Sequence, residues 1–363
     1  MTTTDLLLRG IEIVADMLID EVENHKNKKE RSKRQIWTRK WVLRRNQLGA
    51  SDNFLREVEE EDPKTYKNHL RLNTLRYLAT GDSFRSLESH FRVPKCSISL
   101  FLTSVLDAIY DALEEFIQTA EEWTIISRGY NNPSNPALST THFYFPGCCG
   151  ALDGKHINIQ KPSDSGSDFF NYKGYFSTAL LALVDANYCF TYIDVGSQGR
   201  LNDASIFGNS VLKNKLEDGT LNFPSWGVIL GDEAFPLKHY LMKPYSRRLP
   251  LTVEKKIFNY RLSRARRIVE NAFGIMTRVR NISGSNILPD KVDKIVKATC
   301  VLHNWLMKTA LHCYAPESPS SYIADLVQQS SNNPSRLAEQ KRTDFTNYFT
   351  GEGAVPWQRS RIF

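Results

Sequence analysis

Residues 175–196 read YFSTALLALVDANYCFTYIDVG, and this stretch decides the fold class. Two apolar runs, Ala179–Val184 and Cys189–Val195, are separated by a turn at Ala186-Asn187. Short runs rich in β-branched and aromatic residues, joined by such a turn, predict a β-hairpin. We therefore expect a sheet in the middle of this 363-residue chain.

Outward from the hairpin, the chain changes from strand-like to helix-like patterns. Further strands are expected at 149–160 and 226–232, and long apolar-periodic helices at about 252–280 and 290–312. Strands that precede long helices indicate an α/β or α+β domain, which we place at residues 142–312. Residues 313–363 are expected to form a linker and a final helix, at about 335–349, that docks on the body.

The first 130 residues are expected to be helical, and the Asn/Pro/Ser-rich stretch 131–141 marks a domain boundary. Within this region, residues 65–118 show three helical segments with stop signals at Gly81 and Pro94. Two helices joined by a short turn after a supporting helix are typical of a helix-turn-helix module. The same pattern occurs in plain packing units, so contact with DNA and contact with protein both stay open.

The formal net charge of +7 is unevenly distributed. Between Lys26 and Arg45 there are ten basic residues and one acid, a net +9, so the rest of the chain sums to −2. Such a run can serve as a nuclear-import signal, as a phosphate contact through residues such as Lys33 and Arg34, or as a solvated helix face. No apolar run is expected to span a membrane.

Four acidic residues stand out by their context. Asp153 lies in a strand, Asp203 follows one, Asp232 ends the apolar run 228–231, and Glu270 lies inside the long helix. Buried carboxylates are costly unless a cation neutralises them, and oxygen ligands that converge favour Mg²⁺ or Mn²⁺. Two such ions ~3.5–4 Å apart could activate water and stabilise a leaving oxygen of a phosphodiester. The alternative is chance, because 40 acidic residues supply many loosely spaced triplets.

Basic residues accompany these acids. Arg266 and Arg267 precede Glu270 by one helical turn and are expected to face a phosphate backbone. Lys155 and Lys173 are further candidates for DNA contact. For Lys155 a solvated side chain, and for Lys173 an aromatic strand edge, is an equally good interpretation.

Four ordered motifs resemble those of the PIF/Harbinger DDE transposases. They are GALDGKH at 150–156, GRLNDA at 199–204, GDEAFP at 231–236 and IVENAF at 268–273. The resemblance covers about residues 145–306 and implies an RNase H-like core with a mixed sheet. It implies Asp153, Asp232 and Glu270 as the catalytic triad, Asp203 as a further metal-binding position, and a divalent metal cofactor, two ions in the full site.

The family resemblance also implies a function. We expect a metal-dependent DNA endonuclease or transposase in which water, and then a 3′-hydroxyl in strand transfer, attacks a phosphodiester. The alternatives are a domesticated DNA- or chromatin-associated scaffold without cleavage and an RNA-directed nuclease. Family members work with a Myb/MADF-like protein that supplies DNA binding and nuclear import, so a nuclear location is expected, with cytoplasm as the location without that partner. The oligomeric state, a homo-oligomer included, stays open.

Overall fold

A computed structural model describes residues 59–91, 93–117, 145–248, 250–276, 287–309 and 334–361. The expected basic segment 26–45, with Lys33 and Arg34, lies outside these residues. The expected boundary at 131–141 and most of the linker from 313 also lie outside them.

The centre of the molecule is a five-stranded mixed sheet. Its strands are β1 (Cys148–Asn158), β2 (Ser177–Val184), β3 (Phe190–Gln198), β4 (Val228–Leu230) and β5 (Leu241–Met242). The order is β3-β2-β1-β4-β5, with antiparallel pairing among β1, β2 and β3 and parallel pairing of β4 with β1 and of β5 with β4. The predicted hairpin is β2–β3, and the predicted α/β class with an RNase H-like core is confirmed. The two-residue β5 was not predicted.

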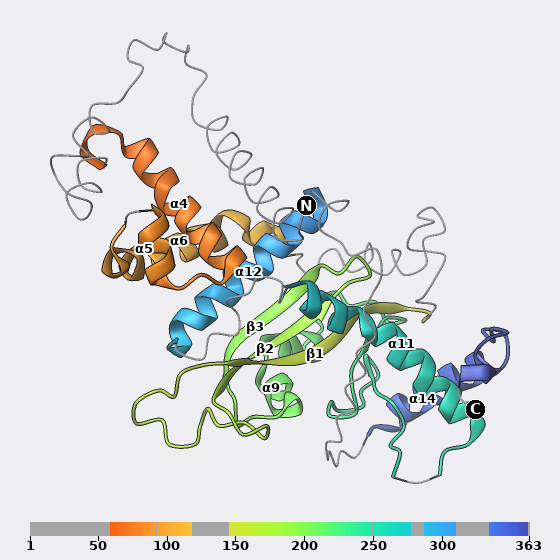
Figure 1. Ribbon diagram of the computed structural model, residues 1–363. Helices are drawn as coiled ribbons and strands as arrows, with labels where there is room; N and C mark the ends of the chain where they lie inside the picture. The colour runs from red at the N-terminus through yellow and green to blue at the C-terminus, as the bar shows by residue number, and fades with distance from the viewer. Residues whose placement is uncertain are drawn as a thin grey trace.

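Helices cover both faces of the sheet, and β2 is accordingly buried along its whole length. Leu180, Ala182 and Val184 belong to one hydrophobic cluster, which includes α11 (Val253–Met276) and α12 (Pro289–Thr309). The alternate residues of β2 belong to a second cluster with α9 (Asp203–Asn209) and α10 (Val211–Glu217). Successive strand residues point to opposite faces, so the sheet is the middle of three layers (Figure 1).

Within the described residues, three α-helices precede the sheet, as predicted for residues 65–118: α4 (Pro63–Thr80), α5 (Phe84–Phe91) and α6 (Lys95–Leu113). The expected signals at Gly81 and Pro94 lie at helix boundaries, since Gly81 follows α4 and Pro94 directly precedes α6. Gly81 adopts a left-handed conformation (φ 71°) after α4, and the Ser83 hydroxyl accepts a hydrogen bond from the Ser86 amide at 3.2 Å. Figure 1 shows this module lying against α12.

The α6 helix is the main contact between this module and the sheet domain. The span Lys95–Phe116 has a mean hydropathy of 1.4 and is long and apolar enough to cross a membrane, contrary to the expectation from the sequence. In the structure one side of α6, with Leu102 and Leu106, is buried in the cluster shared with α12. Lys294 of α12 pairs with Asp107, so the apolar character of α6 has a packing role here.

The C-terminal segment packs on α11 through α14 (Arg336–Thr350). Ser335 caps α14, and Phe349 contacts the rings of Phe145 and Phe258. The Gln358 side chain then donates a hydrogen bond to the carbonyl oxygen of Phe349 at 2.8 Å. This end of the chain therefore stabilises the half of α11 that precedes Glu270.

Candidate metal centre

Asp153 lies in the middle of β1, between the antiparallel β2 and the parallel β4. Its side chain is 15% exposed, and its Oδ1 accepts a hydrogen bond from the Gly154 amide at 3.0 Å. Residues of β1 alternate between the two faces, so Asp153 lies on the side of α11 and Gly154 on the side of α9. On this central strand the Asp153 carboxylate therefore lies toward α11, and Gly154, which has no side chain, leaves space toward α9.

Asp203 reaches the sheet because residue 154 has no side chain. A Cβ atom on Gly154 would lie 2.1 Å from Oδ1 of Asp203, far closer than real Cβ contacts come. Asp203 is the first residue of α9, and the Asn202 side chain caps that helix by accepting from the Ser205 amide at 2.8 Å. The helix start therefore fixes the direction of the Asp203 side chain.

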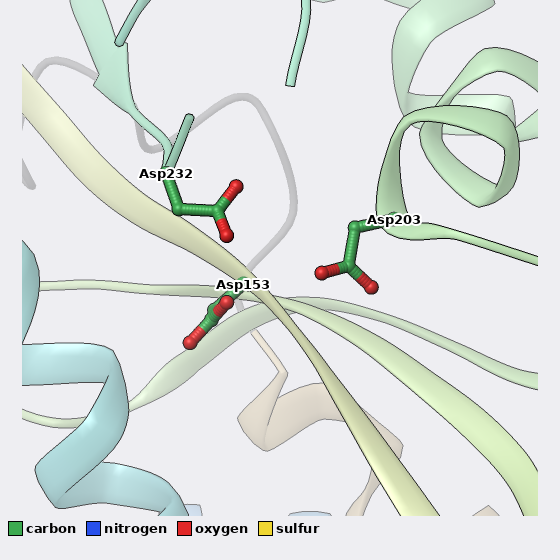
Figure 2. A group of neighbouring side chains, drawn as sticks. All are labelled: Asp153, Asp203 and Asp232. Carbon is green, nitrogen blue, oxygen red and sulfur yellow. The ribbon is translucent and has the colours of Figure 1, made fainter. Parts of the chain in front are cut away.

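Asp232 lies two residues after β4, the strand that runs parallel to β1. Its Oδ1 accepts a hydrogen bond from the Ala234 amide at 2.9 Å. One carboxylate oxygen from each of Asp153, Asp203 and Asp232 lies within 4.8 Å of the others. Figure 2 shows the side chains of Asp203 and Asp232 pointing toward each other beside Asp153, so three distant parts of the sequence meet at one point.

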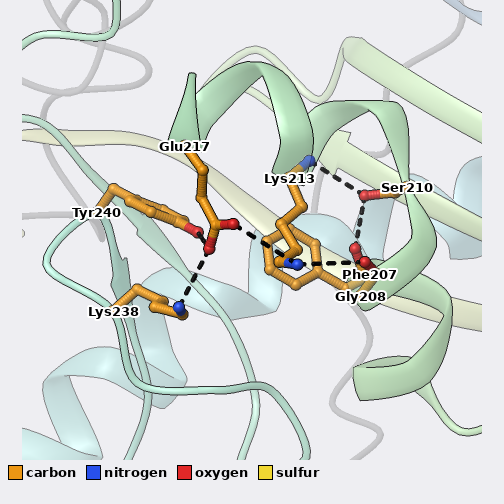
Figure 3. Close-up of polar contacts among 7 residues, drawn as sticks. All are labelled: Phe207, Gly208, Ser210, Lys213, Glu217, Lys238 and Tyr240. Carbon is orange, nitrogen blue, oxygen red and sulfur yellow. Dashed lines mark hydrogen bonds and ion pairs between the residues drawn. The ribbon is translucent and has the colours of Figure 1, made fainter. Parts of the chain in front are cut away.

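The helical pair α9–α10 is held against the segment that follows Asp232. Phe207 of α9 makes an edge contact with Phe235, with ring centroids 5.9 Å apart. Figure 3 shows the polar part of this contact, in which Glu217 of α10 accepts hydrogen bonds from Lys238 Nζ and from the Tyr240 hydroxyl, each at 3.1 Å. These contacts set the position of Asp203 relative to Asp232.

Burial and mutual repulsion act on these carboxyl groups. Burial, reinforced by the charges of Asp153 and Asp232, raises the pKa of Asp203 to about 7. Burial and the charge of Asp153 raise the pKa of Asp232 to about 6. Two like charges separated by 4.8 Å repel by about 3.5 kcal/mol at an effective dielectric constant of about 20. The cluster is therefore stabilised either by protons or by a cation.

The residues present fit a divalent cation. All three donors are carboxylates, the hard oxygen ligands that Mg²⁺ and Mn²⁺ prefer, and their spacing allows one ion to contact each of them. The predicted metal ligands Asp153, Asp203 and Asp232 are thus brought together. The predicted fourth ligand, Glu270, lies outside this group of three.

Glu270 and Arg266, one turn apart on α11, face the sheet beside Asp153. Nη1 of Arg266 lies 3.0 Å from Oδ2 of Asp153, and Nη2 pairs with Oε1 of Glu270. Burial and the charge of Asp153 raise the pKa of Glu270, and Arg266 opposes that rise. The Arg266 side chain, which was expected to face a phosphate backbone, is 17% exposed and bridges these two carboxylates.

All these groups line one cavity of about 750 Å³. Of the predicted DNA contacts, Lys155 and Lys173 line it and Arg267 does not. Nζ of Lys155 lies 5.5 Å from the centre of the Phe273 ring, and Nζ of Lys173 lies 5.5 Å from that of Tyr172. Lys155 belongs to β1, and Lys173 lies in the connection between β1 and β2.

A further part of the cavity lining was missed from the sequence. It is formed by Tyr245, Ser246, Arg247 and Arg248, which follow β5, and we call these four residues the 245–248 wall. The sequence does contain a signal for this basic segment, because residues 243–267 include nine basic residues and one acid. The wall adds two exposed arginines to the lining of the cavity that Lys173 also lines.

Comparison with known proteins gives a consistent family. Residues 152–304 match the family model described as DDE superfamily endonuclease. The chain is 27% identical over 243 residues to "Putative nuclease HARBI1" of Homo sapiens, across 64% of this chain and 65% of that protein. It is 26% identical over 257 residues to "Protein ALP1-like" of Arabidopsis thaliana, across 65% of this chain and 61% of that protein. The matched part is thus a little under two thirds of these relatives' length. No solved structure matches the chain.

The family match begins one residue before Asp153 and ends at Asn304, the α12 residue whose side chain bonds the backbone of Phe190 in β3. It therefore contains the three clustered aspartates, Arg266 and Glu270. Residues 152–304 thus resemble a DDE superfamily endonuclease domain, and the chain is similar to a putative nuclease and to an ALP1-like protein, in line with the resemblance that its motifs indicated.

Proposed function

We propose that this protein is a divalent-metal-dependent DNA endonuclease of the Harbinger transposase type, with strand transfer to a 3′-hydroxyl as its further step. The observation that carries the proposal is the convergence of Asp153, Asp203 and Asp232 at one end of the cavity, within the part of the chain that matches DDE endonucleases. The charge of this cluster calls for a cation, and the cavity beside it has room for a phosphodiester.

Asp153, Asp203 and Asp232 would hold the cation, Mg²⁺ or Mn²⁺, with Glu270 as a ligand of a second ion. A bound divalent cation would supply charge stabilisation for the reacting phosphodiester and favour ionisation of the attacking water. The raised pKa of Glu270 suits it to hold and orient that water. Asp153 and Asp232 are the catalytic partners of Glu270 in this proposal.

The charge around the cavity supports DNA as the substrate. The 245–248 wall contributes Arg247 and Arg248 to the cavity lining, and Lys155 and Lys173 line the same cavity. Guanidinium and ammonium groups that line one cavity suit the phosphates of a nucleic-acid backbone. Arg267, on α11 beyond the cavity, would extend the contact along the helix, and Lys33 and Arg34 would add to it from the N-terminal segment.

A nuclear location and a Myb/MADF-like partner complete the proposal. The location is supported by the basic segment 26–45, and the partner by the family resemblance, with which the nearly neutral remainder of the chain is in keeping. A fluorescent fusion of the whole chain, compared with one in which the ten basic residues of that segment are replaced by Gln, tests the location. Unchanged nuclear accumulation would show that import does not depend on this segment.

A plasmid-nicking assay tests the activity. Wild-type protein is incubated with supercoiled plasmid and Mn²⁺ or EDTA, beside Asp153→Asn and Asp232→Asn, with and without a candidate partner. Asp344→Asn is the matched control, because Asp344 is exposed on α14 and does not line the cavity. We expect metal-dependent nicking by wild type and Asp344→Asn, and background nicking by the two cavity variants.

The opposite result has a definite meaning. The nuclease proposal would be contradicted if folded wild-type protein neither nicked DNA in the presence of its partner nor bound Mn²⁺. The domesticated scaffold, in which the same fold mediates contacts without cleavage, would then be the better account.

A further inference from the structure

Arg266 occupies an unusual place for a basic residue beside a metal centre. Its guanidinium lies between Asp153 and Glu270 and pairs with one oxygen of each. Nη1 is buried and, although it forms the ion pair with Asp153, it has no hydrogen-bond partner among the described residues. The charges of Asp153, Glu270 and Asp232 overcome burial and raise the pKa of Arg266, so the guanidinium keeps its charge.

We infer that Arg266 is a positioning residue that acts as a built-in counter-cation and sets the order in which divalent ions enter. The inference rests on the proposed function. The first ion binds among the three aspartates, and a second ion, which needs Glu270, enters only when Arg266 withdraws from Asp153 and Glu270.

The occupancy of each carboxylate oxygen supports this order. Asp153 has both oxygens engaged, Oδ1 by the Gly154 amide and Oδ2 by Arg266. Oε1 of Glu270 is engaged by the same guanidinium. In contrast, neither Asp203 nor Asp232 forms an ion pair with any residue in the described ranges, although both lie within 4.8 Å of the Asp153 carboxylate. A cation therefore finds unneutralised carboxylates on the Asp203 side and a competing positive charge on the Glu270 side.

The chemistry of arginine makes the competition unavoidable. A guanidinium has donors only and cannot lose its proton in a protein, so it makes way for another cation only by moving. Its planar fork also spans two carboxylates at once, which a lysine ammonium cannot do as well. Once released inside the cavity, the Arg266 guanidinium is available to a phosphate oxygen, which would give it the DNA contact that the sequence suggested.

Mn²⁺ binding to the full chain tests the inference without measuring catalysis. Isothermal calorimetry and the EPR signal of free Mn²⁺ give the number and affinity of sites at pH 7.5 for wild type, Arg266→Met, Arg266→Lys and Glu270→Gln. We expect one tighter and one weaker site in wild type. Arg266→Met should tighten the weaker site at least tenfold, Arg266→Lys should tighten it less, and Glu270→Gln should abolish it.

Arg264→Met is the matched control, because it removes the same charge from α11 at a residue that does not line the cavity and whose guanidinium lies 4.2 Å from the centre of the Trp357 ring. Its isotherm should follow that of wild type. Thermal melts by circular dichroism identify any variant that does not fold, and Arg266→Lys, which keeps the charge, then decides the question.

Two outcomes would overturn the inference, and they are distinguishable. If wild type binds Mn²⁺ and the weaker site is unchanged or lost when Arg266 is replaced, Arg266 only supports Glu270 structurally and the proposed function stands. If wild type binds no Mn²⁺ at all, the proposed function fails and this inference fails with it.

Discussion

Gly154 is the residue on which the geometry of the metal centre depends most directly. It is the neighbour of Asp153 in β1, and its missing side chain leaves the space that the Asp203 carboxylate occupies. The sequence motif around Asp153 contains this glycine, but the motif alone gives no reason for it. The reason is steric and involves a residue some fifty positions away.

Replacing Gly154 tests this dependence. Gly154→Ala places a methyl group 2.1 Å from Oδ1 of Asp203, so Asp203 or β1 has to move. We expect Mn²⁺ affinity to fall at least tenfold by calorimetry. Gly208→Ala is the control within α9, because a Cβ there meets nothing within 4 Å, and it should leave affinity unchanged and cost no stability. Equal affinities for wild type and Gly154→Ala would contradict the steric account.

The pH dependence of metal binding follows from the same carboxyl groups. Asp203 and Asp232 have pKa values of about 7 and about 6, so both carry protons at pH 5, and a metal ion has to displace these protons. Apparent Mn²⁺ affinity should therefore rise on the order of 100-fold or more between pH 5 and pH 8, since each unit below a pKa costs about tenfold. An affinity that is flat across this range would contradict the assignment.

Stability of the metal-free protein should show the opposite trend. The folded pKa of both aspartates lies above the ordinary value of about 3.9, so the folded state holds protons that the unfolded state has already released. These groups therefore lower stability as pH rises from about 4 to about 7. Urea unfolding in EDTA should show this loss, and Mn²⁺ should reverse it at pH 7.5 and have little effect at pH 5.

At the scale of single residues, the sequence identified the acids but not all of their neighbours. Asp153, Asp203 and Asp232 could be chosen because they sit at strands and strand ends with apolar flanks. Arg247 and Arg248 were missed because they lie in a loop, where no periodicity marks the direction of a side chain. The bridging position of Arg266 depends on how α11 packs on β1, which spacing along one helix does not give.

At the scale of elements, the position of α9 decides whether Asp203 belongs to the cluster. The Phe207–Phe235 contact buries two rings, whereas the Glu217 contacts with Lys238 and Tyr240 are partly exposed. Burial of large apolar groups contributes several kcal/mol, and exposed ion pairs contribute about 0–1 kcal/mol. The aromatic contact should therefore dominate.

Two substitutions separate these contributions. Phe207→Ala should lower the free energy of unfolding by about 3–5 kcal/mol. It should also weaken Mn²⁺ binding because α9 loses its support. Glu217→Gln, at a side chain that is 37% exposed, should cost less than about 1 kcal/mol and leave Mn²⁺ binding unchanged. Urea unfolding and calorimetry measure both. A larger effect for Glu217→Gln than for Phe207→Ala would reverse the ranking.

The elements themselves were largely predictable. The β2–β3 hairpin and the helices α11, α12 and α14 were found because their apolar patterns run for six residues or more. The two-residue β5 was not found, because it has no period to detect, and it forms only by pairing with β4. That pairing also positions the 245–248 wall, which follows β5. The strand and this part of the cavity lining were therefore missed for the same reason.

At the scale of the whole molecule, the N-terminal module and the sheet domain share one hydrophobic core. Leu106 of α6 and Val296 of α12 lie in the same buried cluster as the residues of β2. The sequence suggested separate regions, because the change of composition at 131–141 says nothing about how the regions pack. A shared core predicts that they unfold together.

Leu106→Ala tests this cooperativity. Leu106 is fully buried, so the variant should lose about 2–5 kcal/mol of stability while far-UV circular dichroism and Mn²⁺ release still report one transition. Leu100→Ala is the control on the same helix, since Leu100 is 78% exposed, and it should change stability by less than about 0.5 kcal/mol. Two separate transitions would show that the module folds on its own.

The net charge of the whole chain does not show how acidic and basic residues are distributed around the cavity. Outside residues 26–45 the sum is −2, yet residues 243–267 carry a net +8 and the cavity beside them is lined by five carboxylates. Opposite charges are thus segregated within one site, with carboxylates for a cation and basic groups for phosphates. An average over the chain removes the pattern that indicates its function.

The most direct test of the central claim is anomalous diffraction at the manganese absorption edge from crystals of the chain grown with Mn²⁺. The account predicts a manganese peak in contact with Asp153, Asp203 and Asp232, which is absent from crystals of Asp153→Asn. Well-ordered density for the three carboxylates with no manganese among them, or manganese bound only elsewhere, would contradict it.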